Sequence, residues 1–343
     1  MTDSHAQQSN DVLQGLIRDV HARWANEHSG EVADYIPELG KADGKHWGLA
    51  VATPDGGLWQ AGDAEVPFTI QSVSKACTYC LALEMAGRET VISRVGVEPS
   101  GDAFNAIEFD PSTLRPFNPM VNAGAITVAG VLYERHGDDA FDFLLERLSI
   151  AAGRQLDMDE AVYRSESATG HRNRAIGHLL RGAGALPGPV EAVVDLYFRQ
   201  CSIRVTAVDL AWIGATLANL GEHPRSGRQA FTLDAIRDTL AVMLSCGMYN
   251  HSGSWLFKVG FPAKSGVGGG LLGVIHRQLG LGAYAPKLDT KGNPVRALHA
   301  FEQLSGELGL HAFDYSNTGS SLLNLYLGTP GTNTASAADL VGG

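Results

Sequence analysis

The stretch FTIQSVSKACTYCLAL, residues 68–83, decides how the rest of the chain is interpreted, because it places Ser72 and Lys75 three positions apart at the start of an apolar run. A lysine on this face either extends its ammonium group to water or is held, desolvated, beside the serine hydroxyl. The second arrangement produces a nucleophile. The chain has seven lysines, so about half of one S-x-x-K is expected by chance at average serine usage. Other parts of the sequence must therefore decide between the two arrangements.

The composition is that of a soluble globular protein. The chain has 343 residues, of which 44% are hydrophobic and 18% charged, and its net charge is −11. An acidic protein repels nucleic acid and anionic membrane surfaces, so we expect no partner of either kind. The N-terminus MTDSHAQQSN lacks a signal peptide pattern, and no apolar run reaches the ~18 residues of a membrane span. These features predict a cytoplasmic protein.

The cysteines and histidines do not predict a metal site. Cys77 and Cys80 form a C-x-x-C, but the pair lies inside the apolar run after Ser72, and no second pair exists. A zinc or redox site is the alternative to two buried small apolar side chains, and we expect the latter. The twelve histidines include no H-E-x-x-H. We therefore expect no metal and no cofactor.

Periodicity predicts helices and strands in a distinctive order. An amphipathic helix is expected over residues 11–27, followed by two strands of a hairpin around the turn Pro54–Gly57. Thr206 and Asp209 resemble a capping box. Strand character returns in 254–266, 271–276 and 279–285, before a last amphipathic helix over 294–309. Between these strands we expect helices at 122–136, 139–149, 173–183, 190–200, 206–220 and 233–245.

This order predicts an α+β fold in which both ends of the chain supply one five-stranded antiparallel sheet. Helices would flank the sheet. We expect a sheet subdomain of about 1–86 plus 245–311 and, inserted into it, a mainly helical subdomain of about 87–244. The polar sequence of 328–343 predicts a flexible tail.

A second motif, Lys264-Ser265-Gly266, stands at the end of a predicted strand. An S-x-x-K at a helix start, followed much later by K-[ST]-G on a strand, is the pattern of penicillin-binding proteins and serine β-lactamases. Its chemistry is acyl transfer through serine. Lys75 can approach the Ser72 hydroxyl from one helical turn away, and burial would lower its pKa enough for it to act as the base. The glycines after Lys264 permit close approach of a backbone N–H, although a flexible turn or a degenerate phosphate loop are alternatives.

Seven further segments narrow the choice within that fold. GEVADYIPELGK (30–41), VPFTIQSVSKA (66–76), FNPMVNAGAI (117–126), ESATGHRNRAIG (166–177), DLYFRQCSI (195–203), SCGMYNHSG (245–253) and FPAKSGVGGGLL (261–272) together resemble the serine-dependent glutaminase family. The resemblance is ordered and spans roughly residues 25–311, which we take as the catalytic domain. It implies a β-lactamase-like fold, hydrolysis of the side-chain amide of L-glutamine to L-glutamate and ammonia, and a homodimer or homotetramer.

The resemblance also implies roles for individual residues. The nucleophile falls on Ser72 and its lysine partner on Lys75. The chemistry of amide hydrolysis adds Tyr249 as a third catalytic residue, which could carry a proton to the departing ammonia. The substrate-binding positions fall on Tyr35, Ser72, Asn122, Glu166, Asn173, Tyr197, Tyr249 and Val267, with Lys264, Ser265 and Gly266 in support. Glu166 would pair with the α-ammonium of glutamine, and Val267 would act through its backbone N–H. The family often has aspartate where this chain has Asn250.

Each residue taken alone has a simpler structural explanation. Asn122 can be a helix N-cap, Glu166 and Asn173 can be loop and cap residues, and Tyr35 can pack beside Pro37. Tyr197 can be a core residue with its hydroxyl at the surface, and Tyr249 a loop aromatic. The joint order and spacing of the segments favour the functional interpretation. Two rivals stay open: a β-lactamase or D,D-peptidase-like hydrolase, and a catalytically silent small-molecule-binding scaffold.

Overall fold

The computed structural model describes residues 2–101, 106–107 and 109–314. The predicted flexible tail, 328–343, lies outside these residues. None of the helices described there is long and apolar enough to cross a membrane.

A five-stranded antiparallel sheet forms the centre of the fold, as expected. Its strands are β2 (Gly48–Ala52), β3 (Leu58–Gly62), β7 (Ala263–Ser265), β8 (Gly270–Ile275) and β9 (Leu279–Tyr284). Their order is β3-β2-β9-β8-β7, so β2 of the first hairpin pairs directly with β9, a strand more than two hundred residues later. The turn of this hairpin contains Gly56, whose φ of 90° suits a residue without Cβ. The prediction that both chain ends build one sheet is confirmed.

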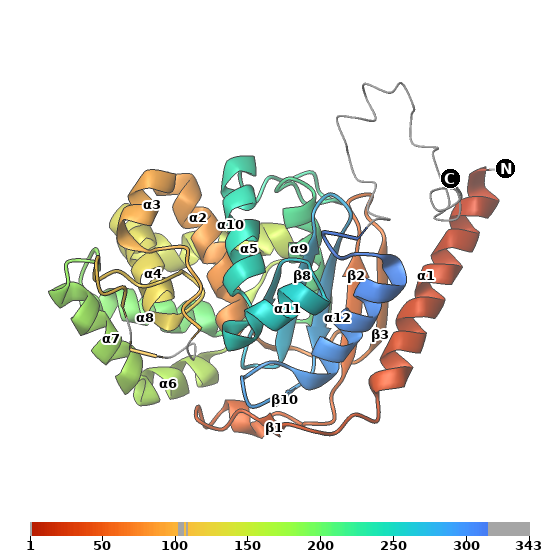
Figure 1. The fold of residues 1–343 in the computed structure, drawn as a ribbon, viewed down its shortest axis with the longest axis horizontal. Coiled ribbons are helices and arrows are strands. Elements are labelled where there is room, and N and C mark those ends of the chain that lie inside the picture. Colours follow the sequence, from red (N-terminus) through yellow and green to blue (C-terminus); the bar gives the residue numbers. More distant parts are fainter. Residues whose placement is uncertain (1, 102–105, 108, 315–343) are drawn as a thin grey trace, which may run out of the picture.

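The two faces of the sheet are covered by different helices (Figure 1). Leu49 and Val51 of β2 belong to one apolar cluster, with α1 (Thr2–Trp24) and α12 (Val295–Leu308). Ala50 and Ala52 point to the opposite face, where α9 (Ala207–Ala218) packs across β2, β8 and β9. This alternation is the period of two that a strand requires.

The close packing of α9 on the sheet depends on glycine. A Cβ placed on Gly282 would lie 2.0 Å from the Ala207 carbonyl oxygen, and one on Gly280 would lie 2.1 Å from the Ala215 amide nitrogen. The predicted capping box at the start of α9 is confirmed, since Thr206 and Asp209 exchange hydrogen bonds. Because α9 falls within 87–244 and yet packs on the sheet, the division into two subdomains stays a prediction.

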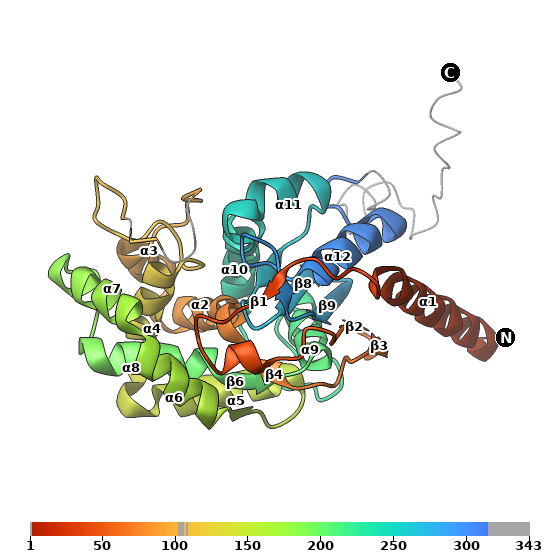
Figure 2. The same cartoon turned by 90° about the horizontal axis from the view of Figure 1, so that it is seen from below.

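Most of the remaining helices gather at the end of the molecule opposite the projecting α1 (Figure 2), whereas α11 (Ser252–Lys258) lies beside the sheet, with its Trp255 in the same apolar cluster as α1 and α12. They confirm the helices expected in the middle of the chain. They are α2 (Ser74–Ala86), α3 (Arg88–Arg94), α4 (Asn122–His136), α5 (Ala140–Ala152), α6 (Glu160–Thr169), α7 (His171–Gly182), α8 (Val190–Cys201), α10 (Leu233–Cys246) and α11 (Ser252–Lys258). Short 3₁₀ helices occur at Leu39–Lys41, Gln71–Val73, Gly137–Asp139 and Tyr249–His251.

Two small sheets, which the sequence did not predict, tie distant segments together. One pairs β1 (Glu31–Val32) with β10 (Lys287–Leu288). The other has the order β4-β6-β5, with β4 (Phe68–Thr69), β6 (Ile203–Val205) and β5 (Asp157–Met158). The second sheet anchors the chain just ahead of Ser72.

The expectation of a strand over 254–266 is wrong for its first half. Ser252–Lys258 is the helix α11, and only Ala263–Ser265 is a strand. The apolar residues of this segment alternate in a way that also fits one helical turn and a half. Trp255 is buried against Phe261 and Phe301, whereas Phe257 is 85% exposed, so tertiary packing selects which apolar side chain enters the core.

Candidate active site

Ser72 lies in a tight turn between strand β4 and helix α2. It is buried and sits in the 3₁₀ helix Gln71–Val73, so the α-helix itself begins two residues later, at Ser74. The residue before it, Gln71, has a φ of 47°, a conformation uncommon for a residue with a Cβ. The turn therefore presents the serine at the head of α2.

Lys75 is buried one turn above Ser72. Its Nζ donates hydrogen bonds to Asn122 Oδ1 at 2.7 Å and to the Met120 carbonyl at 3.3 Å. In the described part of the chain, Ser72 is not among its hydrogen-bond partners. Burial lowers the pKa of Lys75 to about 8, although the nearby Glu166 acts in the opposite direction. A neutral amine has two N–H donors and one lone pair. In the neutral form both donors would be used by Asn122 and Met120, which leaves the lone pair to accept a proton.

A cavity of about 110 Å³ opens beside Ser72 and collects most of the predicted binding residues. It is lined by Tyr35, Ile36, Gln71, Ser72, Asn122, Glu166, Thr169, Gly170, Arg172, Asn173 and Tyr197. These residues come from the segment after β1, the turn before α2, and helices α4, α6, α7 and α8. The volume has room for several water molecules or one small polar molecule.

Polar side chains across this cavity form a continuous chain of hydrogen bonds. The Tyr197 hydroxyl donates to Asn122 Oδ1 at 3.2 Å, and Asn122 Nδ2 donates to Asn173 Oδ1 at 3.0 Å. Asn122 is the first residue of α4 and Val121 is the N-cap, so Asn122 does not cap the helix. Tyr197 is buried, so its hydroxyl is not at the surface. These contacts join α2, α4, α7 and α8 around one point.

Glu166 is a buried carboxyl group inside α6. Gln71 Nε2 donates to its Oε2 at 3.4 Å, and no ion pair to it forms among the described residues. Burial raises the pKa of Glu166 to about 8, and the charge of Lys75 only partly opposes this. A buried carboxyl group without a cation favours its neutral form until a positive group arrives. The cavity is therefore suited to a ligand that brings a cation.

Tyr249 and the K-S-G strand lie on the other side of Ser72. The Tyr249 hydroxyl donates to the Ser265 carbonyl at 2.9 Å. Burial raises the pKa of Tyr249, while its hydrogen bond with Ser72 acts in the opposite direction. Lys264 Nζ donates to the same Ser265 carbonyl at 2.6 Å and lies 4.3 Å from the centre of the Tyr249 ring. Burial and the charge of Lys75 lower the pKa of Lys264.

The end of β7 approaches the chain ahead of Ser72 closely. A Cβ on Gly266 would lie 2.9 Å from the Ile70 carbonyl oxygen, which explains the glycine after Lys264 and Ser265. Val267 follows and is buried in a small cluster with Ile36 and Leu39. The Lys264-Ser265-Gly266 motif is therefore in contact with the turn that carries Ser72.

The structure gathers the predicted residues in two groups. Tyr35, Ser72, Asn122, Glu166, Asn173 and Tyr197 line the cavity. Lys75, Tyr249, Lys264, Ser265, Gly266 and Val267 are not part of its lining. Tyr35 is 55% exposed, in keeping with a place at the cavity mouth. The sequence did not indicate Ile36, Gln71, Thr169, Gly170 and Arg172, each of which lies within three positions of a residue that it did indicate.

Cys77 and Cys80 are fully buried in α2, which confirms their interpretation as small apolar side chains. Burial raises the pKa of the Cys77 thiol to about 12. Within residues 2–101, 106–107 and 109–314, no group of three or more His, Cys, Asp or Glu side chains is arranged to hold a metal ion.

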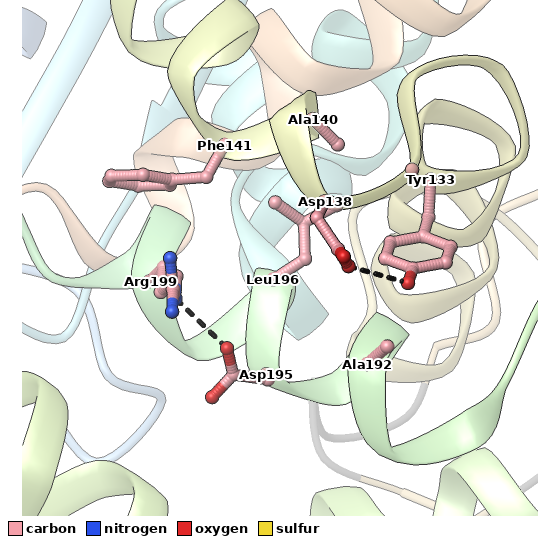
Figure 3. Close-up of a pocket in the computed structure, with 9 residues that line it drawn as sticks. Tyr133, Asp138, Ala140, Phe141, Ala192, Asp195, Leu196 and Arg199 are labelled. Atoms are coloured by element: carbon pink, nitrogen blue, oxygen red, sulfur yellow. Dashed lines mark hydrogen bonds and ion pairs between the residues drawn. The ribbon is translucent and has the colours of Figure 1, made fainter.

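A second cavity, of about 170 Å³, lies between the end of α4, α5 and α8 (Figure 3). Its polar groups are already paired. The Tyr133 hydroxyl donates to Asp138 Oδ1 at 2.8 Å, and Arg199 forms an ion pair with Asp195 at 2.9 Å (Figure 3). This cavity therefore lacks a buried carboxyl group like that of Glu166, which has no cation beside it among the described ion pairs.

An S-x-x-K serine at the head of a helix, facing a K-S-G strand of a five-stranded antiparallel sheet, defines the class of proteins with a β-lactamase-like fold. Within this class, the model of the Glutaminase family matches residues 30–313, and the chain belongs to that family.

Individual relatives agree with this assignment. The chain is 52% identical over 299 residues to Glutaminase 2 of Bradyrhizobium diazoefficiens, a match that covers 87% of this chain and 48% of the relative. It is 45% identical to the Glutaminase of Nostoc sp. over 305 residues, which is 89% of this chain and 91% of the relative. A solved structure of Mglu in its glutamate form superposes with a TM-score of 0.84 at 41% identity, covering 90% of this chain and 71% of that one. The chain thus spans about half the length of the two Bradyrhizobium relatives it matches.

Proposed function

We propose that this protein hydrolyses the side-chain amide of L-glutamine to L-glutamate and ammonia through a γ-glutamyl ester on Ser72. The observation that carries the proposal is the cavity that Ser72 shares with the buried carboxyl group of Glu166, which forms no ion pair among the described residues. A nucleophile and an acid a short distance apart suit a substrate with an amide at one end and an ammonium group at the other. The names of the relatives, and the glutamate in the Mglu structure, support this substrate.

Recognition of the amino acid end rests on charge and on neutral donors. The α-ammonium group of glutamine would pair with Glu166, which removes the cost of burying either charge alone. The α-carboxylate needs donors, and Asn122, Asn173 and Tyr197 supply amide and hydroxyl groups at the cavity wall. Tyr35 would cover the mouth.

The acylation step transfers one proton and exchanges one bond. The Ser72 oxygen attacks the amide carbon as its proton moves to the free lone pair of Lys75, either directly or through Tyr249. The backbone N–H groups of Ser72 and Val267 would stabilise the oxyanion. The C–N bond then breaks, and ammonia leaves with a proton returned by Tyr249 or Lys75.

Deacylation repeats these events with water. The same base takes a proton from water, the water oxygen attacks the ester carbon, and the Ser72 oxygen leaves and regains its proton. Lys264, Ser265 and Gly266 would support this step by holding Tyr249 and the strand. Side chains supply the nucleophile and the acid–base groups, so the mechanism needs no cofactor. A cytoplasmic location and a homodimer or homotetramer complete the proposal.

The test combines turnover with covalent labelling. Ammonia and glutamate should appear in equal amounts from glutamine, nitrocefin should not be hydrolysed, and 6-diazo-5-oxo-L-norleucine should leave an adduct on the peptide that contains Ser72. Ser72→Ala should abolish turnover and the adduct. Nitrocefin turnover would favour a β-lactamase-like hydrolase, and binding of glutamine without turnover would favour a silent scaffold. An adduct on Cys77 or Cys80 with an active Ser72→Ala would refute the serine ester.

A further inference from the structure

Two residues beside Ser72 have strained backbones. Among the described residues, the non-glycine residues with positive φ are Gln71, Leu114, Leu220, Tyr249 and Arg277. Gln71, with φ of 47°, directly precedes Ser72, and Tyr249, with φ of 56°, forms a hydrogen bond with it. A strained conformation of this kind persists only where the surrounding structure holds it in place. The groups that hold Gln71 and Tyr249 therefore control the geometry at Ser72.

The two strained residues are held by the same device. Each is the first residue of a 3₁₀ helix, Gln71–Val73 or Tyr249–His251, and each helix is followed by a serine that begins an α-helix. Ser74 donates both its N–H and its hydroxyl to the Gln71 carbonyl, with an Oγ to O distance of 2.7 Å. Ser252 donates the same two groups to the Tyr249 carbonyl, with an Oγ to O distance of 2.9 Å.

A further donor orients each serine hydroxyl. Ser74 Oγ accepts a hydrogen bond from Gln200 Nε2 at 3.2 Å, and Ser252 Oγ accepts one from the Met248 amide at 3.0 Å. A hydroxyl group has one proton, so a serine that accepts on one side gives that proton to the strained carbonyl on the other. Gln200 Oε1 lies 3.2 Å from the Thr78 hydroxyl, whose one proton is shared with the Ser74 carbonyl at 3.0 Å, so Thr78 contacts both Gln200 and Ser74. Ser74, Thr78 and Gln200 are at most 1% exposed.

We propose that Ser74 and Ser252 are positioning residues, which hold Ser72 and Tyr249 in the relative position that proton transfer between them requires. Gln200 fixes the direction of the Ser74 hydroxyl. The catalytic roles of Ser72 and Tyr249 that this inference uses rest on the proposed function. Gln200 lies three residues after Tyr197 on α8, so it also ties the helix that lines the cavity to the turn that carries Ser72. Gln71 in turn reaches Glu166.

The variants that test this are Ser74→Ala, Ser252→Ala and Gln200→Met, with Ser305→Ala as the matched control. Ser305 is also a buried serine whose hydroxyl donates to a backbone carbonyl, that of Val259, at 2.7 Å, but it lies on α12. Small displacements of a nucleophile are costly, so we expect kcat to fall about 10- to 100-fold in the first two variants. KM should change by less than about threefold, because the groups that bind the amino acid end are untouched. Ser305→Ala should keep kcat while its melting temperature falls.

A double-mutant cycle separates positioning from general loss of stability. Once Ser74 has lost its hydroxyl, Gln200→Met should cost no further kcat, because Gln200 acts through that hydroxyl. Multiplicative losses, or a kcat in Ser74→Ala that stays within twofold of the wild type, would overturn the inference. The inference would also be overturned if kcat fell across the variants only in proportion to the fall in melting temperature.

The rate at which phenylmethanesulfonyl fluoride labels Ser72 makes the test independent of glutamine. This reagent has neither an ammonium group nor a carboxylate, so it reports the reactivity of Ser72 alone. Slower labelling in Ser74→Ala than in Ser305→Ala would support the positioning role, even if the wild type did not hydrolyse glutamine. Equal labelling rates would refute the positioning role, even if glutamine turnover were confirmed.

Discussion

Lys75 Nζ donates a 2.7 Å hydrogen bond to Asn122 Oδ1, although the two residues are 47 positions apart in the chain. This contact joins the base proposed for Ser72 to a residue that lines the cavity. The residue at position 122 also has to be uncharged, because a carboxylate there would favour the charged form of Lys75. The amide of Asn122 therefore positions Lys75 without the rise in the lysine pKa that a carboxylate would cause.

Replacing this amide should disturb the base directly. In Asn122→Asp, a carboxylate next to Lys75 should raise the pKa of the lysine by about 1–3 units. The acidic limb of the pH profile of kcat/KM should move upward by the same amount, and activity at neutral pH should fall. The profile of the variant is to be compared with that of Asn122→Ser, which removes the amide but adds no charge. Identical limbs in the two variants would show that Lys75 is not the group that titrates.

The lysine itself should be indispensable to the chemical step. Lys75→Arg keeps the positive charge but cannot lose a proton at working pH, so kcat should fall about 10²- to 10⁴-fold. Circular dichroism and the melting temperature should show a folded protein. An arginine variant with nearly unchanged kcat would mean that Lys75 is structural.

Binding of glutamine should release a proton. Burial raises the pKa of Glu166 to about 8, so below that pH its carboxyl is largely neutral in the free protein. Pairing with an ammonium group lowers the pKa, and the proton then leaves. The release should approach one proton per site near pH 7 and disappear above about pH 9. Isothermal titration of Ser72→Ala with glutamine, in buffers of different ionisation enthalpy, counts these protons. Glu166→Gln in the same background is the control, and it should release no proton. If Ser72→Ala with Glu166 intact also released none at pH 7, the carboxyl group of the free protein would already be ionised.

Glu166 should distinguish amino acids from simple amides. Glu166→Gln removes the charge that pairs with the α-ammonium group, and losing such a desolvated pair typically costs ~2–5 kcal/mol, or about 30- to 5000-fold in kcat/KM. The loss should be much smaller for the des-amino analogue of glutamine, because that substrate brings no cation. Both enzymes are assayed with both substrates. Equal losses would assign Glu166 to holding α6 in place instead.

The contact of α9 with the sheet should depend on the absence of a side chain at Gly282. A Cβ there would lie 2.0 Å from the Ala207 carbonyl, so Gly282→Ala should force α9 away from the sheet and cost about 1–3 kcal/mol of unfolding free energy. Gly253→Ala is the control, since nothing lies within 4 Å of a Cβ at this position in α11. Alanine favours a helix, so that variant should be neutral or slightly more stable. A Gly282→Ala variant as stable as the wild type would contradict the packing.

Local chemistry determined several features that the sequence predicted correctly. The turn at Pro54–Gly57 and the alternation on either side specify a hairpin, and the capping box at Thr206 specifies where α9 begins. The interactions behind each pattern join residues only a few positions apart, so the pattern can be recognised without knowing how the rest of the chain folds. The spacing of Ser72 and Lys75 is of the same kind.

Other features depend on contacts between residues far apart in the chain, and only the tertiary structure decided them. The sequence did not indicate that 252–258 would be a helix, because apolar spacing in so short a segment fits both periods and Trp255 is selected only by its packing on Phe261. Nor did it indicate that Lys75 would bond to Asn122, or that Ser74 and Ser252 would hold two strained residues beside Ser72. The partners of Lys75 and Ser74 come from α4 and α8, which the sheet and its helices bring to one place. Contacts between residues far apart in the chain depend on how whole elements pack, and that packing is settled by the burial of apolar surface over the entire molecule.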